Sequence, residues 1–117
     1  TSTPLQALVV MNDPQFVEAA RAIATRAVKE GGATTEGRAR CAFRLLATRE
    51  PTAGESRLLC ALYDQQLGEF RRDTAAAEKL VHVGDSKPDA TIAPADLAAA
   101  TVMAQAVLSL DASIWER

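Results

Sequence analysis

Alanine supplies twenty-four of the 117 residues, and this constrains the fold more than any other feature of the sequence. Alanine loses no side-chain entropy in a helix, so a chain this rich in it favours helices throughout. Glycine and proline fall between the periodic blocks, and no strand-like alternation is longer than about four residues. The sequence therefore predicts an all-α fold, a compact bundle of five to six mostly antiparallel helices that form one domain over residues 1–117.

Capping and stop signals divide the chain into helices. Asp13 can cap a helix that has Pro14 at its first position and ends near Glu30, before two glycines. Thr52 and Glu55 have the spacing of a capping box, in which each side chain accepts a hydrogen bond from the other residue's backbone N–H. The remaining signals predict helices over about 5–11, 35–48, 73–83 and 95–110.

Apolar residues spaced three and four apart predict which face of each helix is buried. The stripe on the helix that begins at Pro14 leaves Arg21 mostly outside, and Phe43 flanks the stripe on the helix over 35–48. The last helix has a one-sided stripe. The inner stripes include Val17, Ala20, Ala24 and Ala27, then Cys41, Ala42, Leu45 and Leu46, then Leu58, Leu59, Leu62 and Tyr63, and finally Leu97, Thr101, Ala104, Val107 and Leu108.

The run from Leu5 to Met11 is apolar on almost every side. Such a helix is normally buried all round, so it is either the central helix of the bundle or packed against a further domain. We expect a mixture, because a chain that begins at Thr1 rather than Met fits the C-terminal part of a larger multidomain protein. The expected docking surface is Leu5, Leu8, Val9 and Met11. An exposed patch of this kind would let the isolated chain self-associate.

The charge balance limits the classes of partner. The net charge of −2 gives no electrostatic footprint for nucleic acid or for an anionic membrane surface. No apolar run approaches the ~20 residues that a membrane span needs, and no signal peptide is recognisable. We therefore expect no nucleic acid and no membrane span, and we expect the partners to be other domains of the parent protein.

Cys41 and Cys60 lie equally far from the turn expected near Pro51, so an antiparallel hairpin places them at the same height. Helix axes pack about 8–10 Å apart, and a disulfide needs Cα atoms within roughly 7 Å, so pairing requires both side chains to point inward. We expect buried free thiols, with a disulfide as the alternative. Two cysteines alone do not make a closed zinc site, which uses four ligands.

The other polar residues have structural explanations. His82 lies near the end of a short helix, where a protonated imidazole suits the helix dipole, and no motif supplies a catalytic partner. A run of basic residues interleaves with Glu36 and Glu50 and predicts a solvated face, with contacts to the parent protein as the alternative. The run consists of Arg38, Arg40, Arg44 and Arg49. We therefore expect no catalytic, cofactor-binding or metal-binding residue in this chain.

Three stretches of the sequence are TSTPLQALVVMNDPQFVEAARAIA, AFRLLATREPTAGE and ADLAAATVMAQAVLSLD. In these stretches, and over residues 1 to about 111, the chain resembles the C-terminal region of a domain of unknown function that occurs in large secreted proteins of planctomycete bacteria. Many such proteins also carry a cytochrome-c-like domain. The resemblance implies a periplasmic, secreted or cell-surface location and transfers no activity. It implies no cofactor in this chain, which has no CxxCH haem motif.

Three functions remain open at this point. We expect a non-catalytic helical module that terminates and stabilises a large exported protein. One alternative is a protein-interaction bundle that binds an external partner through a groove. The other is a region that completes an active site in the parent protein, for which the only support is an analogy to the parent's other domains.

Overall fold

A computed structural model describes residues 13–47, 49–84 and 87–115, with side chains up to Ser109. The chain forms α2 (Pro14–Glu30), α3 (Thr35–Ala47), α4 (Ala53–Arg72), α5 (Thr74–Val81) and α6 (Pro94–Trp115). These five helices enclose one compact core, and the described residues contain no strand. The all-α prediction is confirmed, whereas the mostly antiparallel arrangement stays a prediction.

Side-chain caps start three of the helices where the sequence predicts them. The Asp13 carboxylate accepts hydrogen bonds from the backbone N–H groups of Gln15 and Phe16, at 2.8 and 3.3 Å. Thr52 and Glu55 form the predicted capping box at the start of α4. Asp73 caps α5 through the N–H of Ala76. Each cap satisfies backbone donors that the first turn of a helix leaves without a partner.

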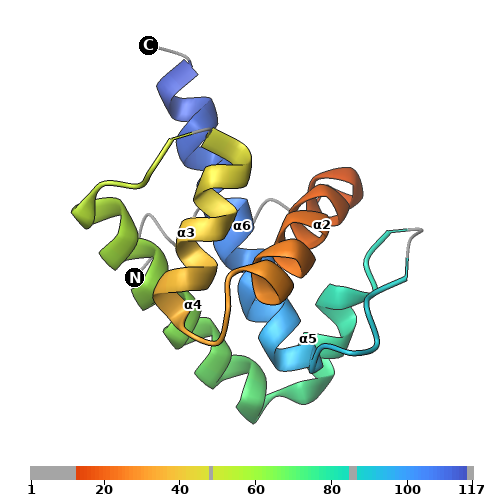
Figure 1. Ribbon diagram of the computed structural model, residues 1–117. Coiled ribbons are helices and arrows are strands. Elements are labelled where there is room, and N and C mark those ends of the chain that lie inside the picture. The colour runs from red at the N-terminus through yellow and green to blue at the C-terminus, as the bar shows by residue number, and fades with distance from the viewer. Residues whose placement is uncertain (1–12, 48, 85–86, 116–117) are drawn as a thin grey trace, which may run out of the picture.

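The last helix, α6, is the centre of the molecule. It passes between α2 and α4, with α3 across it and α5 near its first turns, and it contacts all four (Figure 1). Every residue from 97 to 107 is buried. The sequence analysis was wrong to give α6 a one-sided stripe, because a helix packed against four others has no solvent-facing side.

Small side chains let α6 be surrounded so closely. Five alanines in its buried part are fully inaccessible to solvent: Ala98, Ala99, Ala100, Ala104 and Ala106. The larger Leu97, Met103 and Val107 fill the spaces that the alanines leave. The Thr101 hydroxyl donates to the Leu97 carbonyl at 2.7 Å, so this buried polar group is satisfied within the helix itself.

Two of the outer helices present faces that differ from the prediction. On α3 the core-facing residues are Ala39, Ala42 and Phe43, whereas Leu45 is only half-buried. Phe43, expected at the flank, is 2% exposed and belongs to the core. On α4, Leu58 is 37% exposed rather than buried. The stripe on α4 is confirmed apart from this edge residue, since Leu59, Leu62 and Tyr63 are buried, whereas the buried face of α3 is shifted toward Ala39 and Phe43.

Two glycines bring the end of α2 against the start of α3. A Cβ atom on Gly31 would lie 2.8 Å from the Gly37 carbonyl oxygen, and a Cβ on Gly37 would overlap the Gly31 carbonyl oxygen. Gly32, between them, has a φ of 86°, a conformation that glycine adopts without strain. Gly31, one of the two glycines expected to end α2, therefore also sets, with Gly37, how closely the next helix approaches.

The expected docking surface of Leu5, Leu8, Val9 and Met11 lies outside the described residues. The prediction for this surface therefore stays a prediction. Among the helices that the structure describes, none combines the length and the apolarity that crossing a membrane requires.

Candidate functional site

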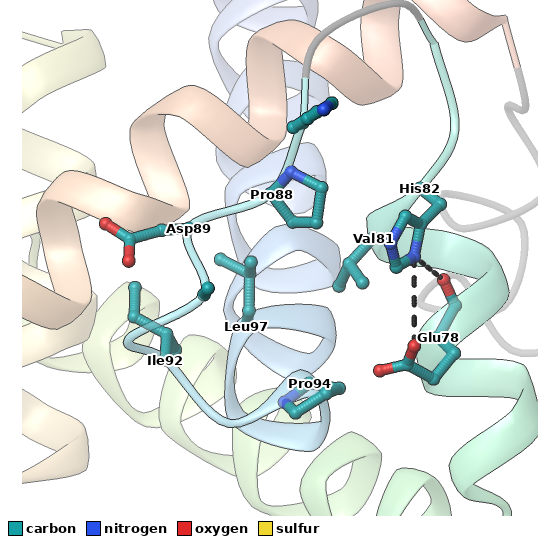
Figure 2. Close-up of a pocket in the computed structure, with 10 residues that line it drawn as sticks. Glu78, Val81, His82, Pro88, Asp89, Ile92, Pro94 and Leu97 are labelled. Atoms are coloured by element: carbon teal, nitrogen blue, oxygen red, sulfur yellow. Dashed lines mark hydrogen bonds and ion pairs between the residues drawn. The ribbon is translucent and has the colours of Figure 1, made fainter.

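A half-open cavity of about 450 Å³ lies between the end of α5, the loop that follows it and the first turn of α6 (Figure 2). Its volume falls within the range of about 300–1,000 Å³ that small-molecule sites occupy. The lining residues are Glu78, Val81, His82, Lys87, Pro88, Asp89, Ala90, Ile92, Pro94 and Leu97. We call this space the α5–α6 cavity.

The floor of the α5–α6 cavity is apolar. Val81, Ile92 and Leu97 are buried, with at most 9% of each residue exposed. The rings of Pro88 and Pro94 flank this floor, on opposite sides of Leu97 in Figure 2. The floor therefore offers a ligand mainly van der Waals contact and release of water.

His82 and Glu78 form the polar edge of the cavity. The His82 Nδ1 lies 2.7 Å from the Glu78 carbonyl oxygen and 4.0 Å from the Glu78 carboxylate (Figure 2). A carbonyl oxygen can only accept, so Nδ1 donates and carries the proton of the neutral ring. The other ring nitrogen, Nε2, then holds a lone pair and acts as an acceptor. The predicted placement of His82 at the end of a short helix is confirmed.

Asp89 holds the loop wall of the cavity against α2. Its carboxylate pairs with Lys29 in the last turn of α2, and it accepts the backbone N–H of Thr91 at 2.8 Å. The Thr91 hydroxyl donates to the same oxygen. The Lys29 ammonium, followed by the Thr91 donors, lowers the pKa of Asp89 from 3.8 to about 2. Asp89 therefore stays ionised as a structural tie in mildly acidic solution.

Arg21 holds the opposite wall of the cavity, which is the end of α5. The sequence analysis placed this residue wrongly. It is 4% exposed, although it was expected mostly outside the stripe. Its Nη1 donates to the carbonyl oxygens of Val81 and Val83, at 2.7 and 2.8 Å. The Val81 carbonyl belongs to the last residue of α5, where a helix leaves its acceptors without intrahelical partners, and the Val83 carbonyl belongs to the turn that follows. The long side chain reaches them by running along the neighbouring apolar surface.

The turn after Val83 is fitted to α2 as well. Gly84 has a φ of 91°, and a Cβ atom there would collide with the Glu18 side chain. Both the backbone conformation and the contact with Glu18 therefore favour glycine at this position. Together with Arg21, this contact joins the first half of α2 to the segment that leads into the cavity.

A second, more open cavity of about 590 Å³ lies where α2 meets α3. Its lining is mostly polar and consists of Glu30, Gly31, Gly37, Arg40, Cys41, Arg44 and Leu45. Arg40 and Arg44 both contact the Glu50 carboxylate, at 2.6 and 3.0 Å. These side chains are exposed, so the ion pairs contribute little to stability and keep their charges largely compensated.

The other two arginines of the basic run have more specific contacts. Arg38 donates to the Tyr63 hydroxyl at 2.8 Å and to the Gly32 carbonyl, which ties the α2–α3 turn to α4. Arg49 lies 4.7 Å from the centre of the Phe43 ring and forms a bidentate pair with Glu55. The Arg49 pair lowers the pKa of Glu55 from 4.5 to about 2.

Cys41 and Cys60 are free, half-buried thiols in the structure. Burial raises the pKa of both. The charged groups near Cys41 are Glu30, Arg26 and Arg44, whereas those near Cys60 are Glu36 and Asp64. The two thiols therefore have different charged surroundings. The alternative that they form a disulfide stays a prediction.

The sequence analysis did not predict the α5–α6 cavity, although it placed His82 at the end of the helix that borders it. Two signals could have indicated it: Pro88 and Pro94 bracket Ile92 within an otherwise polar loop, and Arg21 interrupts the apolar side of α2.

Within the described ranges, no three histidine, cysteine, aspartate or glutamate residues come together as they would to hold a metal ion.

A family model described as PSD1, protein of unknown function (DUF1553), matches residues 1–63. The match extends over α2, α3 and the first half of α4, and it confirms the resemblance in this part of the chain. From residue 64 to about 111 the resemblance stays a prediction. No curated protein and no solved structure gives a significant match to the chain.

Replacing Arg21 tests its role at the end of α5. We expect Arg21→Met to lower the free energy of unfolding by about 1–3 kcal/mol, because the Val81 and Val83 carbonyls lose their donor in a buried place. Urea unfolding followed by far-UV circular dichroism measures the change. Arg26→Met, on the exposed side of the same helix, is the matched control and should unfold like the wild type. Equal midpoints for the two variants would contradict this role.

Replacing Asp89 tests the tie between the loop and α2. The folded chain keeps Asp89 ionised down to about pH 2, whereas the unfolded chain takes up the proton near 3.8. The stability that this carboxylate contributes is therefore complete above 3.8 and is lost as the pH falls toward 2. We expect wild type to lose more stability than Asp89→Asn between neutral pH and about pH 3, as measured by urea unfolding. An identical acid dependence of the two proteins would refute the tie.

Proposed function

This chain belongs to the PSD1 family of proteins of unknown function (DUF1553), and we propose that it is a non-catalytic helical module of a larger exported protein. In this proposal the module stabilises the protein at its C-terminal side by packing against the other domains. The resemblance to secreted planctomycete proteins supports the exported location and suggests the kind of parent.

One observation carries the proposal: polar side chains that could take part in acid–base chemistry make structural contacts instead. The Arg21 guanidinium holds the end of α5, the Asp89 carboxylate binds Lys29, and the His82 Nδ1 donates to a backbone carbonyl. A catalytic acid or base must be placed to exchange its proton with a substrate. Groups that fix helix ends and loops support a scaffold role instead.

The apolar run at Leu5–Met11 supports packing against other domains. This run precedes α2 directly, and the family match includes it. An apolar segment that joins a bundle of this size to neighbouring domains would bury area on both sides and fix their relative positions. The docking surface in this proposal is the one expected from the sequence, namely Leu5, Leu8, Val9 and Met11.

The test compares the whole protein, as encoded by its gene, with a short chain that consists of residues 1–117 alone. We expect Leu8→Asp to destabilise the whole protein by about 1–3 kcal/mol, because a carboxylate would lose water at the domain contact, and to leave the short chain almost unchanged. Calorimetry of the two forms measures the difference. Leu58→Asp, at the exposed leucine of α4, is the control and should change neither form.

Two outcomes would overturn the proposal. Equal destabilisation of the long and short forms by Leu8→Asp would place Leu8 in the core of the bundle itself. A gene that encodes these residues alone would leave no other domain to bind. Specific capture of a separate protein that depends on Leu8 would favour the interaction bundle instead.

A further inference from the structure

We propose that the α5–α6 cavity binds a small apolar molecule whose polar end donates hydrogen bonds, such as an alcohol or an alkylammonium. This inference does not depend on the proposed packing against other domains. It rests on three features of the described residues: the two ties that hold the walls, the apolar floor, and the acceptors at one edge.

Two polar ties fix the cavity walls to α2. Arg21 fixes the end of α5 through the Val81 and Val83 carbonyls, and the ion pair of Lys29 with Asp89 fixes the loop on the other side. Both ties start from α2, which packs on the central helix. Each wall is therefore fixed to α2 by polar contacts, in addition to the apolar contact of Val81 or Ile92 with the core.

The floor selects the body of the ligand. Val81, Ile92 and Leu97 have no polar side-chain atom, and the flanking Pro88 and Pro94 have no backbone N–H to donate. A compact hydrocarbon group in this space would displace water that gains few hydrogen bonds from the floor. Ligand pockets of this kind take their specificity from a few polar groups at the edge.

The edge at α5 selects the polar end of the ligand. The contact of His82 Nδ1 with the Glu78 carbonyl leaves Nε2 as an acceptor, and the Glu78 carboxylate accepts as well. Figure 2 shows these two side chains together beside Val81, across the cavity from Asp89. A hydroxyl can donate its one proton to either acceptor, and an ammonium group can donate to both. A carboxylate has no proton to donate and would meet the negative charge of Glu78.

The other charges around the cavity leave this preference in place. The charge of Asp89 is compensated by Lys29. Lys87 is exposed and belongs to the loop wall, directly before Pro88. Arg21 lies behind the wall, with its Nη1 directed at backbone carbonyls rather than at the cavity. Glu78 is therefore the charged group beside which the polar end of a ligand would lie.

The test uses three probes with the same six-carbon chain: hexanol, hexylammonium and hexanoate. Two-dimensional amide NMR of the whole chain in slightly alkaline buffer follows each titration. We expect hexanol and hexylammonium to shift the amides of residues 78–82 and 89–97. We expect hexanoate to bind about tenfold more weakly, a difference of about 1.4 kcal/mol.

Variants separate the two acceptors. His82→Phe keeps an aromatic ring but removes the acceptor, so it should weaken hexanol and hexylammonium alike, each by several-fold. Glu78→Gln keeps a carbonyl acceptor without the charge, so it should weaken hexylammonium and spare hexanol. Glu69→Gln, on α4 and paired with Arg72, is the control and should change neither affinity.

Four results would overturn the proposal. These are equal binding of hexanoate, unchanged affinities in His82→Phe, amide shifts spread over the whole chain, and no shifts with any probe. The first two would show that the edge does not select a donor, the third that the probes partition without a site, and the last that the cavity takes no such ligand. None of them bears on the packing of Leu8 against another domain, so the two proposals fail separately.

Discussion

The all-round burial of α6 is the constraint on which the rest of the structure depends. A central helix can contact four neighbours only if much of its surface is made of small side chains, and alanine provides this at little cost in helix propensity. The outer helices then need only one apolar face each. Their opposite faces carry ion pairs such as that of Arg26 with Glu30, which is exposed and of little weight for stability.

Polar contacts then decide the shape of one end of the molecule. Arg21 and Lys29 extend from one helix to two different segments, and the α5–α6 cavity lies between the segments that they hold. The scaffold role and the ligand cavity are compatible, because the groups that keep the walls in place differ from His82 and Glu78 at the edge. The proposed packing against other domains and the proposed ligand site can therefore coexist in one chain.

Local signals made much of the fold predictable. Asp13, Thr52 and Asp73 start helices because each cap is a contact between residues two or three apart, which the sequence displays directly. The central position of α6 was not predicted, because its alanine-rich part is less apolar than Leu5–Met11 and apolarity does not reveal how many neighbours a helix has. Arg21 was misplaced for a related reason, since its acceptors lie about sixty residues away along the chain. The cavity combines segments far apart in sequence, and no local pattern encodes that meeting.

Native-state hydrogen exchange tests most directly whether α6 is the centre of the fold. Amides that open only on global unfolding exchange most slowly, whereas those near a surface exchange through local fluctuations. The structure predicts that the slowest amides in the chain lie between residues 97 and 107, and that the amides of α5 exchange faster. Exchange in residues 97–107 that is as fast as in α5 would contradict the central position of α6.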